Sequence, residues 1–285
     1  MKTSIGRRAL GKITIAVIVL AVTAGLVAFY SLAGIEKGGT GTAPSTKSGP
    51  YVSNVEIERF LYEDEELYMR LKISGEADLR DRVEINGVYG WWFGSISVTL
   101  PDGSQARLLR PEDHTTIFDQ FRQLPGTLTV DVYLPWMWYE KHCLEGAYNV
   151  TVWLKGPYEN RTVLYEKIFN LKMALTATVS PTTWRSWEEN VEITVANTGD
   201  IPLILQGIGM EMTETGTVIG WIFAPTLEQG ILVVMPGETK TWVGKPTMVG
   251  DLKEVLSGKM LQVDFVLGIA GAPRRFAATT NVRFP

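Results

Sequence analysis

From residue 51 onward, apolar side chains alternate with polar ones in short runs such as VEIERFLY, LYMRLKI, SISVTL, TLTVDVYL, YNVTVWL and VLYEKIF. A period of two is typical of β-strands that bury one face and expose the other to water. Pro, Gly, Asn and Asp punctuate the runs, for example at 101–103, 124–126 and 156–160. The pattern therefore predicts short antiparallel strands in a sandwich or barrel.

The same alternation resumes after residue 173 and continues to the end of the chain, which predicts two tandem domains over residues 51–173 and 174–285. Each half also contains one stretch of helical periodicity, at 113–124 and at 251–258. Each predicted helix leads through a Gly into a similar strand, LPGTLTVDVYL in the first half and LSGKMLQVDFVL in the second. This likeness predicts an internal repeat of two related modules.

The amino terminus predicts a membrane anchor. Residues 13–33 form an uncharged apolar run of about 20 residues, which is the length that a helix needs to cross a bilayer. Because basic residues precede the run, we expect residues 1–12 to be a cytoplasmic tail and the bulk of the chain to be extracellular. Residues 34–50, rich in Gly, Ser, Thr and Pro, predict a flexible linker. Outside the cell, Asn149 and Asn160 would be candidate glycosylation sites in their Asn-x-Thr sequons.

Two processing events remain alternatives to a retained anchor. The stretch SLAG offers small residues for signal-peptidase cleavage after Ala33, although the apolar run is longer than that of an ordinary signal peptide. The stretch RRALGK resembles the processing site of archaeal type IV pilins, although Lys12 departs from that pattern. The resemblance implies cleavage after Ala9 and a pilin-like subunit of an extracellular filament.

Charge and cysteine content exclude several classes of protein. Residues 1–50 hold six Lys or Arg against one Glu, so they carry +5 and residues 51–285 carry −9 of the net −4. An acidic body of this kind is a poor electrostatic match for nucleic acid. A single cysteine, Cys143, excludes an intrachain disulfide framework and a multi-cysteine zinc site. It is either a buried apolar residue or a free thiol that is available for an intermolecular disulfide.

The residues that carry common chemistry are scarce. The only histidines, His114 and His142, are not near a Gly-x-Ser-x-Gly elbow, which disfavours a serine hydrolase. The acidic stretch 63–66 is interpreted as a solvated turn between two strands rather than a carboxylate pair or a calcium loop. Met137, His142, Cys143 and His114 match the ligand types of a blue-copper site, but adjacent residues of a strand point to opposite faces. We therefore predict no catalytic residues, no cofactor and no metal.

Aromatic residues concentrate in the stretch LPWMWYEKHC at 134–143. Trp136 and Trp138 would share one face of a strand and, with Tyr139, could form a ligand or partner surface, to which Trp91, Trp92 and Phe93 of GWWFGS could add. Core or interdomain packing is the favoured interpretation, because buried tryptophans are common in β-sandwiches. Trp136 and Trp138 remain the candidate sugar-stacking residues of the alternative, a carbohydrate-binding module.

The second half carries a family resemblance. Its strand VEITVAN places Val191, Ile193 and Val195 inward, and Gly199 is expected to take a positive φ in the following turn. The succession of VANTGDIPLIL, GTVIGWIF, VMPGETKTWVG, DLKEVLSG and a final VRFP resembles the late embryogenesis abundant type 2, or WHy, domain over residues 174–285. Thr198 and Gly199 replace the central Pro-Asn of the family turn. The resemblance implies an immunoglobulin-like or fibronectin-like sandwich, without a catalytic site, in a family associated with envelopes and stress protection.

The sequence as a whole predicts an all-β protein with two tandem antiparallel β-sandwich domains behind one transmembrane helix. We expect a non-catalytic, single-pass protein of the cell surface that binds or scaffolds other envelope proteins, or serves as an accessory subunit of a membrane complex. The filament subunit and the carbohydrate-binding module are the alternatives.

Overall fold

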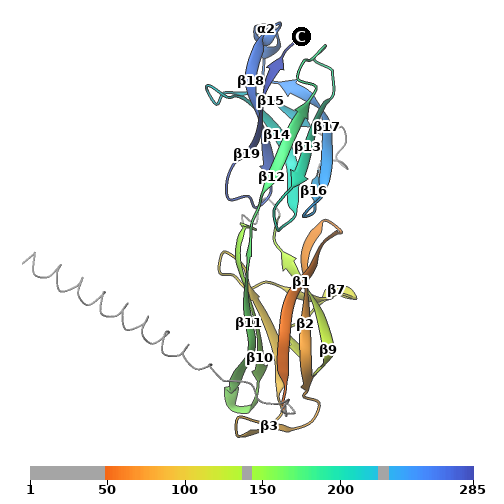
Figure 1. Cartoon of the computed structure of the whole chain (residues 1–285), viewed down its shortest axis with the longest axis vertical. Coiled ribbons are helices and arrows are strands. Elements are labelled where there is room, and N and C mark those ends of the chain that lie inside the picture. The colour runs from red at the N-terminus through yellow and green to blue at the C-terminus, as the bar shows by residue number, and fades with distance from the viewer. Residues whose placement is uncertain (1–48, 137–142, 224–230) are drawn as a thin grey trace, which may run out of the picture. The chain divides into compact units, whose positions relative to one another are not determined.

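The computed structural model describes residues 49–136, 143–223 and 231–285, and strands and helices are numbered as in Figure 1. Residues Gly49–Pro285 form one compact unit, and its regular structure is almost entirely antiparallel β-strand. The predicted all-β class is therefore confirmed. The predicted membrane span at 13–33 lies outside the described residues, and no helix within them is long and apolar enough to cross a membrane.

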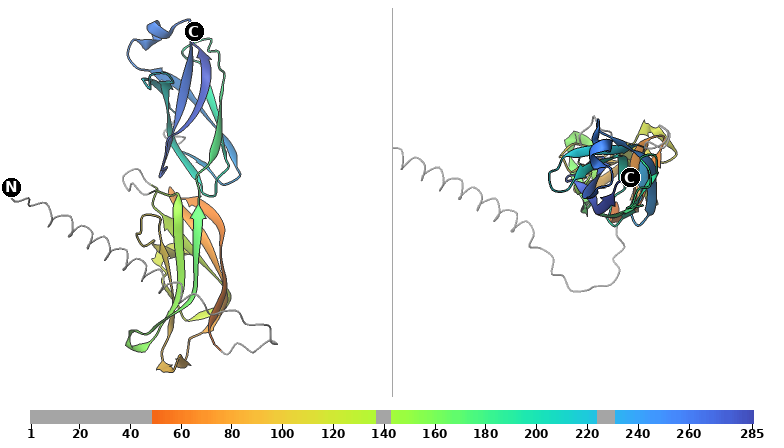
Figure 2. Two further views of the ribbon diagram at one scale, coloured as in Figure 1. Left: turned by 60° about the vertical axis from the view of Figure 1, so that its left-hand side comes forward. Right: turned by 90° about the horizontal axis from the view of Figure 1, so that it is seen from above.

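Residues 51–171, which we call the first module, contain two larger sheets that pack face to face in a sandwich-like arrangement (Figures 1 and 2). One sheet has the strand order β1-β2-β9-β6-β7, and the other has the order β11-β10-β5-β8. A separate hairpin, β3-β4, and a 3₁₀ turn, η1, complete the module. The bounds are β1 (Tyr51–Glu63), β2 (Glu66–Asp78), β3 (Val83–Ile85), β4 (Val88–Gly90), β5 (Phe93–Thr99), β6 (Leu108–Arg110), β7 (Asp113–Ile117), β8 (Gln120–Phe121), β9 (Gln123–Leu134), β10 (Gly146–Lys155), η1 (Pro157–Glu159) and β11 (Arg161–Leu171).

Alternation along the central strands builds the core of the first module. Every second side chain of β2 and of β10 is buried, and side chains of this kind stabilise a fold by about 1.5–3 kcal/mol each. The face of each sheet that meets the other is thereby apolar, as the sequence pattern predicts. These residues are Leu67, Met69, Leu71 and Ile73 on β2, and Tyr148, Val150, Val152 and Leu154 on β10.

The acidic stretch 63–66 is the turn between β1 and β2, as predicted. Glu63 pairs with Glu66, and the two residues between them, Asp64 and Glu65, have φ values of 50° and 63°. A two-residue hairpin loop with positive φ at both positions matches the right-handed twist of the flanking strands, and Asp tolerates that conformation. The cluster of charges is therefore a consequence of hairpin geometry.

The helix predicted at 113–124 is wrong, because this segment forms β7, β8 and the beginning of β9. The carboxylate of Asp113 accepts the backbone N–H groups of Thr115 and Thr116 at 2.9 and 2.8 Å, and also both of their hydroxyls. These hydrogen bonds, led by that of the Thr116 hydroxyl, lower the pKa of Asp113 to about 2 and fix a local turn that competes with helix. Phe118, in the connection after β7, and Phe121, in β8, are both buried three residues apart without helix between them.

Residues 175–283, which we call the second module, form an eight-stranded sheet in the order β12-β13-β17-β15-β14-β18-β19, with β16 paired to β14. β17 is shared between two layers, since Thr239–Gly244 pairs with β13 and Lys245–Met248 pairs with β15. The bounds are β12 (Leu175–Ser180), β13 (Val191–Asn197), β14 (Leu203–Met212), β15 (Val218–Phe223), β16 (Leu232–Val234), β17 (Thr239–Met248), α2 (Leu252–Leu256), β18 (Met260–Ile269) and β19 (Phe276–Arg283).

The turn after β13 differs from the prediction in one respect. Val191, Ile193 and Val195 are buried as expected. Gly199, however, is not among the residues with positive φ. Glycine is needed there because a Cβ would lie 2.4 Å from the carbonyl oxygen of Lys172 and 2.5 Å from the nitrogen of Ala174. The close approach of two backbone segments therefore explains Gly199.

The predicted internal repeat stays a prediction, although both of the stretches on which it rests are in or next to central strands. LPGTLTVDVYL lies in β9 and LSGKMLQVDFVL leads into β18, and each of these strands pairs with a neighbour on both sides. The predicted helix at 251–258 is present as α2, Leu252–Leu256. Its counterpart in the first module is the β7–β8 segment, so the two modules differ at this point.

Candidate functional site

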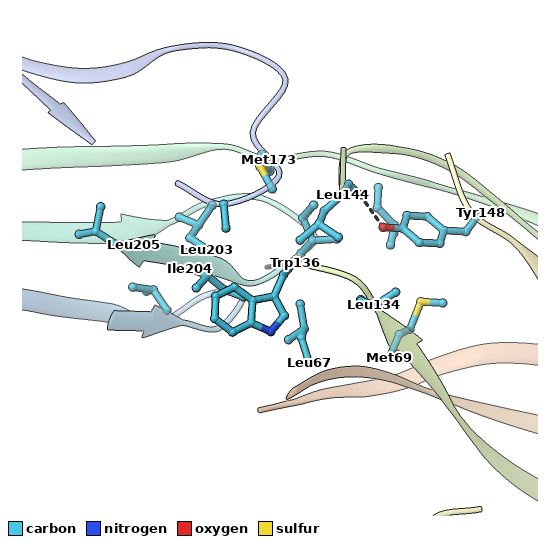
Figure 3. Close-up of a cluster of buried hydrophobic side chains, with 14 of the residues drawn as sticks. Leu67, Met69, Leu134, Trp136, Leu144, Tyr148, Met173, Leu203, Ile204 and Leu205 are labelled. Atoms are coloured by element: carbon cyan, nitrogen blue, oxygen red, sulfur yellow. Dashed lines mark hydrogen bonds between the residues drawn. The ribbon is translucent and has the colours of Figure 1, made fainter. Parts of the chain in front are cut away.

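Trp136 belongs to the core and not to a ligand surface. Its side chain is 4% exposed, its indole N–H donates to the carbonyl oxygen of Glu65 at 3.1 Å, and its ring packs 5.9 Å from that of Tyr62. Figure 3 shows it in a buried cluster with residues of both modules, including Leu67 and Ile204. Trp136 thus offers no free ring face for stacking on a sugar. Trp138 and Tyr139, the other members of the predicted surface, lie outside the described residues.

Glu145 connects the two modules by polar contacts, next to the buried Leu144 and Met173 that Figure 3 labels. Its carboxylate accepts the Met173 N–H at 2.8 Å and the Arg274 guanidinium at 2.8 and 2.9 Å. Arg274 also donates to the carbonyl oxygen of Met173, and Leu144 donates its N–H to Gly271 at 3.1 Å. Burial acts to raise the pKa of Glu145, but the bonds from Arg274 and Met173 lower it overall. We call these residues the joint.

Cys143 lies next to the joint. It is half-buried and unpaired, and its Sγ donates to the carbonyl oxygen of Glu145 at 3.3 Å. Cys143 therefore has a feature of each predicted alternative, because it is partly buried and its thiol forms no disulfide. His142 and Met137, which complete the copper-type set, lie outside the described residues.

Asp131 is the centre of a buried polar cluster on β2, β7 and β9. Its fully buried carboxylate accepts two hydrogen bonds from Arg70, at 2.6 and 2.7 Å, and lies 2.8 Å from Nε2 of His114. The hydrogen bonds that Arg70 donates to Asp131 raise the pKa of Arg70. The ring of Tyr68 stacks on His114 at 4.2 Å between centroids. Because Arg70 engages both carboxylate oxygens, the cluster resembles a structural ion pair more than an acid–base site.

Within the part of the chain that the structure describes, an open groove in the first module is a candidate binding site. It consists of two adjoining hollows of about 420 and 350 Å³, which share Arg110, Phe118 and Leu128. Cavities of this size, with apolar walls and a few polar groups, are typical of ligand sites. We call it the arginine groove. Its lining is Phe93, Arg110, Phe118, Gln120, Phe121, Arg122, Gln123 and Leu128 in the larger hollow, with Pro111, Glu112, Asp113 and Thr129 added in the smaller one.

The two arginines of the groove lie against aromatic rings. The guanidinium carbon of Arg122 is 4.7 Å from the ring centroid of Phe93 and 5.5 Å from that of Trp91, and Arg110 lies 5.5 Å from Phe118. Both side chains are exposed. Among the described residues, neither makes an ion pair or a side-chain hydrogen bond. Their N–H donors are therefore available to a ligand.

A glycine in β5, Gly94, explains why the Phe121 ring at the base of the groove can lie close to the strand. Gly94 of β5 pairs with Phe121 of β8, and a Cβ on Gly94 would lie 2.2 Å from the Phe121 ring. The absence of a side chain at Gly94 thus admits the ring of Phe121 against the backbone. Phe121 and Phe118 are buried at 6% and 8% exposure, whereas Phe93 is half-buried. Apolar rings consequently form the floor, and arginines form the exposed wall.

Part of this groove coincides with an aromatic stretch that the sequence singled out. In GWWFGS, Phe93 lines the groove, Trp91 is 43% exposed beside Arg122, and Trp92 is buried. The sequence did not point to the arginines, because they belong to separate segments: Arg110 ends β6 and Arg122 lies between β8 and β9. The signal that the sequence did offer was a single Arg, Arg122, directly after Phe121 and four residues after Phe118.

The two predicted glycosylation sites differ in access. Asn149 is half-buried on β10, between β5 and β11, and its side-chain amide donates to Glu166 at 3.0 Å. Asn160 is exposed after η1, where its amide donates to the carbonyl oxygen of Pro157 at 2.8 Å. Asn160 is therefore the more accessible acceptor for a glycan.

No family model and no curated protein matches the chain. Among solved structures, it is similar to a tetra-tandem repeat in the extending region of a large adhesion protein, with 11% identity and a TM-score of 0.30, over 83% of this chain and 50% of that chain. It is also similar to red sea bream transglutaminase, with 12% identity and a TM-score of 0.28, over 84% and 31%. A protein of unknown function from Porphyromonas gingivalis W83 matches with 12% identity and a TM-score of 0.24, over 79% and 97%.

The chain thus spans half of the adhesion-protein structure and less than a third of the transglutaminase. At these TM-scores the similarities carry no argument about activity, ligand or partner.

Proposed function

We propose that this chain is a membrane-anchored protein of the cell surface that binds or scaffolds components of the envelope and catalyses no reaction. The observation that carries the proposal is the arginine groove, because it combines apolar rings with arginines that have no partner among the described residues. The apolar run 13–33 and the basic residues before it support the anchor and its orientation.

The joint supports the scaffolding part of the proposal. Glu145, Met173 and Arg274 connect the modules by charge-assisted hydrogen bonds, and Trp136 lies in a buried cluster to which both modules contribute. Modules that share buried contacts behave more as one body than modules on a free linker. Such a connection suits a protein that holds a partner at a surface.

We extend the proposal to the fold of each module, which we assign to the immunoglobulin-like or fibronectin-like sandwiches. For the second module, the pattern from VANTGDIPLIL to VRFP that resembles the WHy domain supports this assignment. The antiparallel sheets and the strand β17, which passes from one layer to the other, are compatible with it. Fold alone does not determine the partner.

The anchor is tested with full-length protein in the membranes of its native cells. We expect it to resist alkaline extraction, to retain residues 1–9, and to be digested by protease added outside intact cells. A mature amino terminus at Leu10 would support the filament subunit instead. One at Gly34 would indicate a secreted protein and would remove the anchor from the proposal.

The binding role is tested by replacing both groove arginines with Gln in the full-length chain. Crosslinking on intact cells should join the unmodified protein to an envelope component in a saturable manner, and the double variant should lose that product. Equal crosslinking by both proteins would contradict a role for the groove.

A further inference from the structure

The geometry points to an acidic saccharide as the ligand of the arginine groove, namely a chain of sugar rings that carry carboxylates. This inference deepens the proposed function and rests on it. The larger hollow holds both arginines, Arg110 and Arg122, and three phenylalanine rings, whereas the acidic residues Glu112 and Asp113 line only the smaller hollow. The carboxylate of the ligand therefore belongs in the larger hollow.

The charge of the site selects an anion. Residues 51–285 carry a formal charge of −9, so an anionic ligand would be repelled by the protein as a whole unless a local site offsets that field. Arg110 and Arg122 supply such a site, because their guanidinium groups make no ion pair within the described part of the chain. A planar guanidinium can donate two parallel hydrogen bonds to one carboxylate.

The rings and amides of the site select a sugar. Phe93 lines the larger hollow with Arg122 over one side of its ring, so the C–H groups of a sugar ring would pack against the part of Phe93 that is left exposed. Gln120 and Gln123 line the same hollow, and their amide groups make no hydrogen bond to other described residues. Each amide can donate and accept, as can each sugar hydroxyl.

The backbone at the groove disfavours an extended peptide. A peptide would bind most readily by adding a strand to a free edge, which requires unpaired N–H and C=O groups. The N–H of Phe118 already donates to Leu108 at 2.8 Å, and the carbonyl of Arg122 accepts from Leu79 at 2.7 Å. The carbonyl of Asp119 accepts from the N–H of Ile96 at 3.1 Å and from the hydroxyl of Ser95 at 2.9 Å. These paired groups disfavour strand addition at Phe118, Asp119 and Arg122, whereas β7 and β8 are the terminal strands of their sheets, so an extended peptide is the competing ligand that the test must exclude.

The inference is tested by titration calorimetry on full-length protein in detergent micelles. The probes are an oligogalacturonate, a neutral oligogalactose of equal length and an oligoglutamate peptide of equal charge. We expect the oligogalacturonate to bind and the neutral sugar and the peptide to bind at least about 10-fold more weakly, because each lacks one of the two features that the groove recognises.

Two variants distinguish binding at the groove from general electrostatic attraction between the protein and the acidic sugar. Arg122→Gln should weaken oligogalacturonate binding by about 10- to 100-fold, the value of a charge-assisted hydrogen bond. Arg161→Gln is the matched control, because Arg161 also lies over a ring, 4.6 Å from the centroid of Trp153, but on β11, at the sheet edge opposite β8. It should leave the affinity unchanged. Circular dichroism checks that both variants fold.

Three results would overturn the inference: peptide binding as tight as that of the acidic sugar, equal binding of the neutral sugar, or equal losses in the two variants. Crosslinking on intact cells distinguishes this failure from failure of the proposed function. If the envelope product still depends on the groove arginines while no acidic sugar binds, the binding role stands and only the ligand class is wrong.

Discussion

At the joint, Arg274 uses its donors within the protein, whereas in the arginine groove Arg110 and Arg122 have no acceptor among the described residues. Arg274 engages the carboxylate of Glu145 and the carbonyl of Met173. Arg122 instead lies over the ring of Phe93, and its N–H groups make no hydrogen bond to the described residues. Arginine thus uses its hydrogen-bond donors within the protein at the joint, whereas in the groove these donors have no acceptor among the described residues.

The difference separates arginines that stabilise the fold from arginines whose N–H donors remain available. An arginine that already forms two hydrogen bonds to a carboxylate has lost the bidentate geometry that an anionic ligand would need. Arg70 follows the pattern of the joint, because the buried Asp131 takes two of its donors. Stability variants should therefore divide the arginines into the same two groups.

Arg70→Met should have the largest effect. It leaves the carboxylate of Asp131 fully buried without its bidentate partner, and an uncompensated buried charge costs about 3–5 kcal/mol. Chemical denaturation of the full-length protein measures the loss. Arg59→Met is the control, because exposed Arg59 lies directly opposite Arg70 on β1. If both variants lose the same free energy of unfolding, the ion pair is not the cause.

Gly94→Ala should destabilise the floor of the groove. The new methyl group would lie 2.2 Å from the Phe121 ring, and relief of such overpacking costs about 1–3 kcal/mol. Gly207→Ala is the matched control, because a Cβ on Gly207, in β14, meets no atom within 4 Å. Thermal unfolding compares the two variants. An unchanged midpoint for Gly94→Ala would show that the ring is not held against the strand.

Glu145→Gln tests the joint and predicts a pH dependence. Because the joint lowers the pKa of Glu145, its contribution is present above the ordinary glutamate pKa and is lost as pH falls through the lowered folded-state value. The variant should lose about 1–2 kcal/mol at neutral pH, since the carboxylate is partly exposed. Denaturant titrations at neutral and acidic pH measure both. The two proteins should converge in acid, and a constant difference would contradict the assignment.

The fold was largely predictable from local pattern, and its one clear error has a local cause. Alternation located β2, β10 and β13 because each buries every second side chain. At 113–124 the buried residues fall three apart, which imitates a helix. The side chain of Asp113 captures two backbone N–H groups and fixes a turn instead. The spacing of apolar residues does not reveal that a side chain will form hydrogen bonds to the neighbouring backbone and so prevent a helix.

The groove was less predictable than the strands, because its residues are distant in the sequence and come together only when the strands pair. Phe93, Arg110 and Leu128 come from β5, β6 and β9, and only the order of strands in two different sheets brings them together. The aromatic stretch at 134–143 was more conspicuous, yet Trp136 is buried at the joint. A concentration of rare residues indicated a core, whereas the candidate site uses common residues that leave their donors unpaired.

Arg122→Gln should have the smallest effect on stability, which makes it the sharpest comparison with Arg274→Gln. An exposed cation–π contact contributes about 0.5–1 kcal/mol, so the loss of unfolding free energy at Arg122 should be near the lower figure. The same substitution at Arg274 removes charge-assisted hydrogen bonds to Glu145 and should cost about 1–2 kcal/mol. Paired denaturation curves for the full-length protein measure the difference. If the two variants lose the same free energy of unfolding, Arg122 stabilises the fold as much as Arg274 does. That result would contradict the view that the N–H donors of Arg122 are unused and available to a ligand.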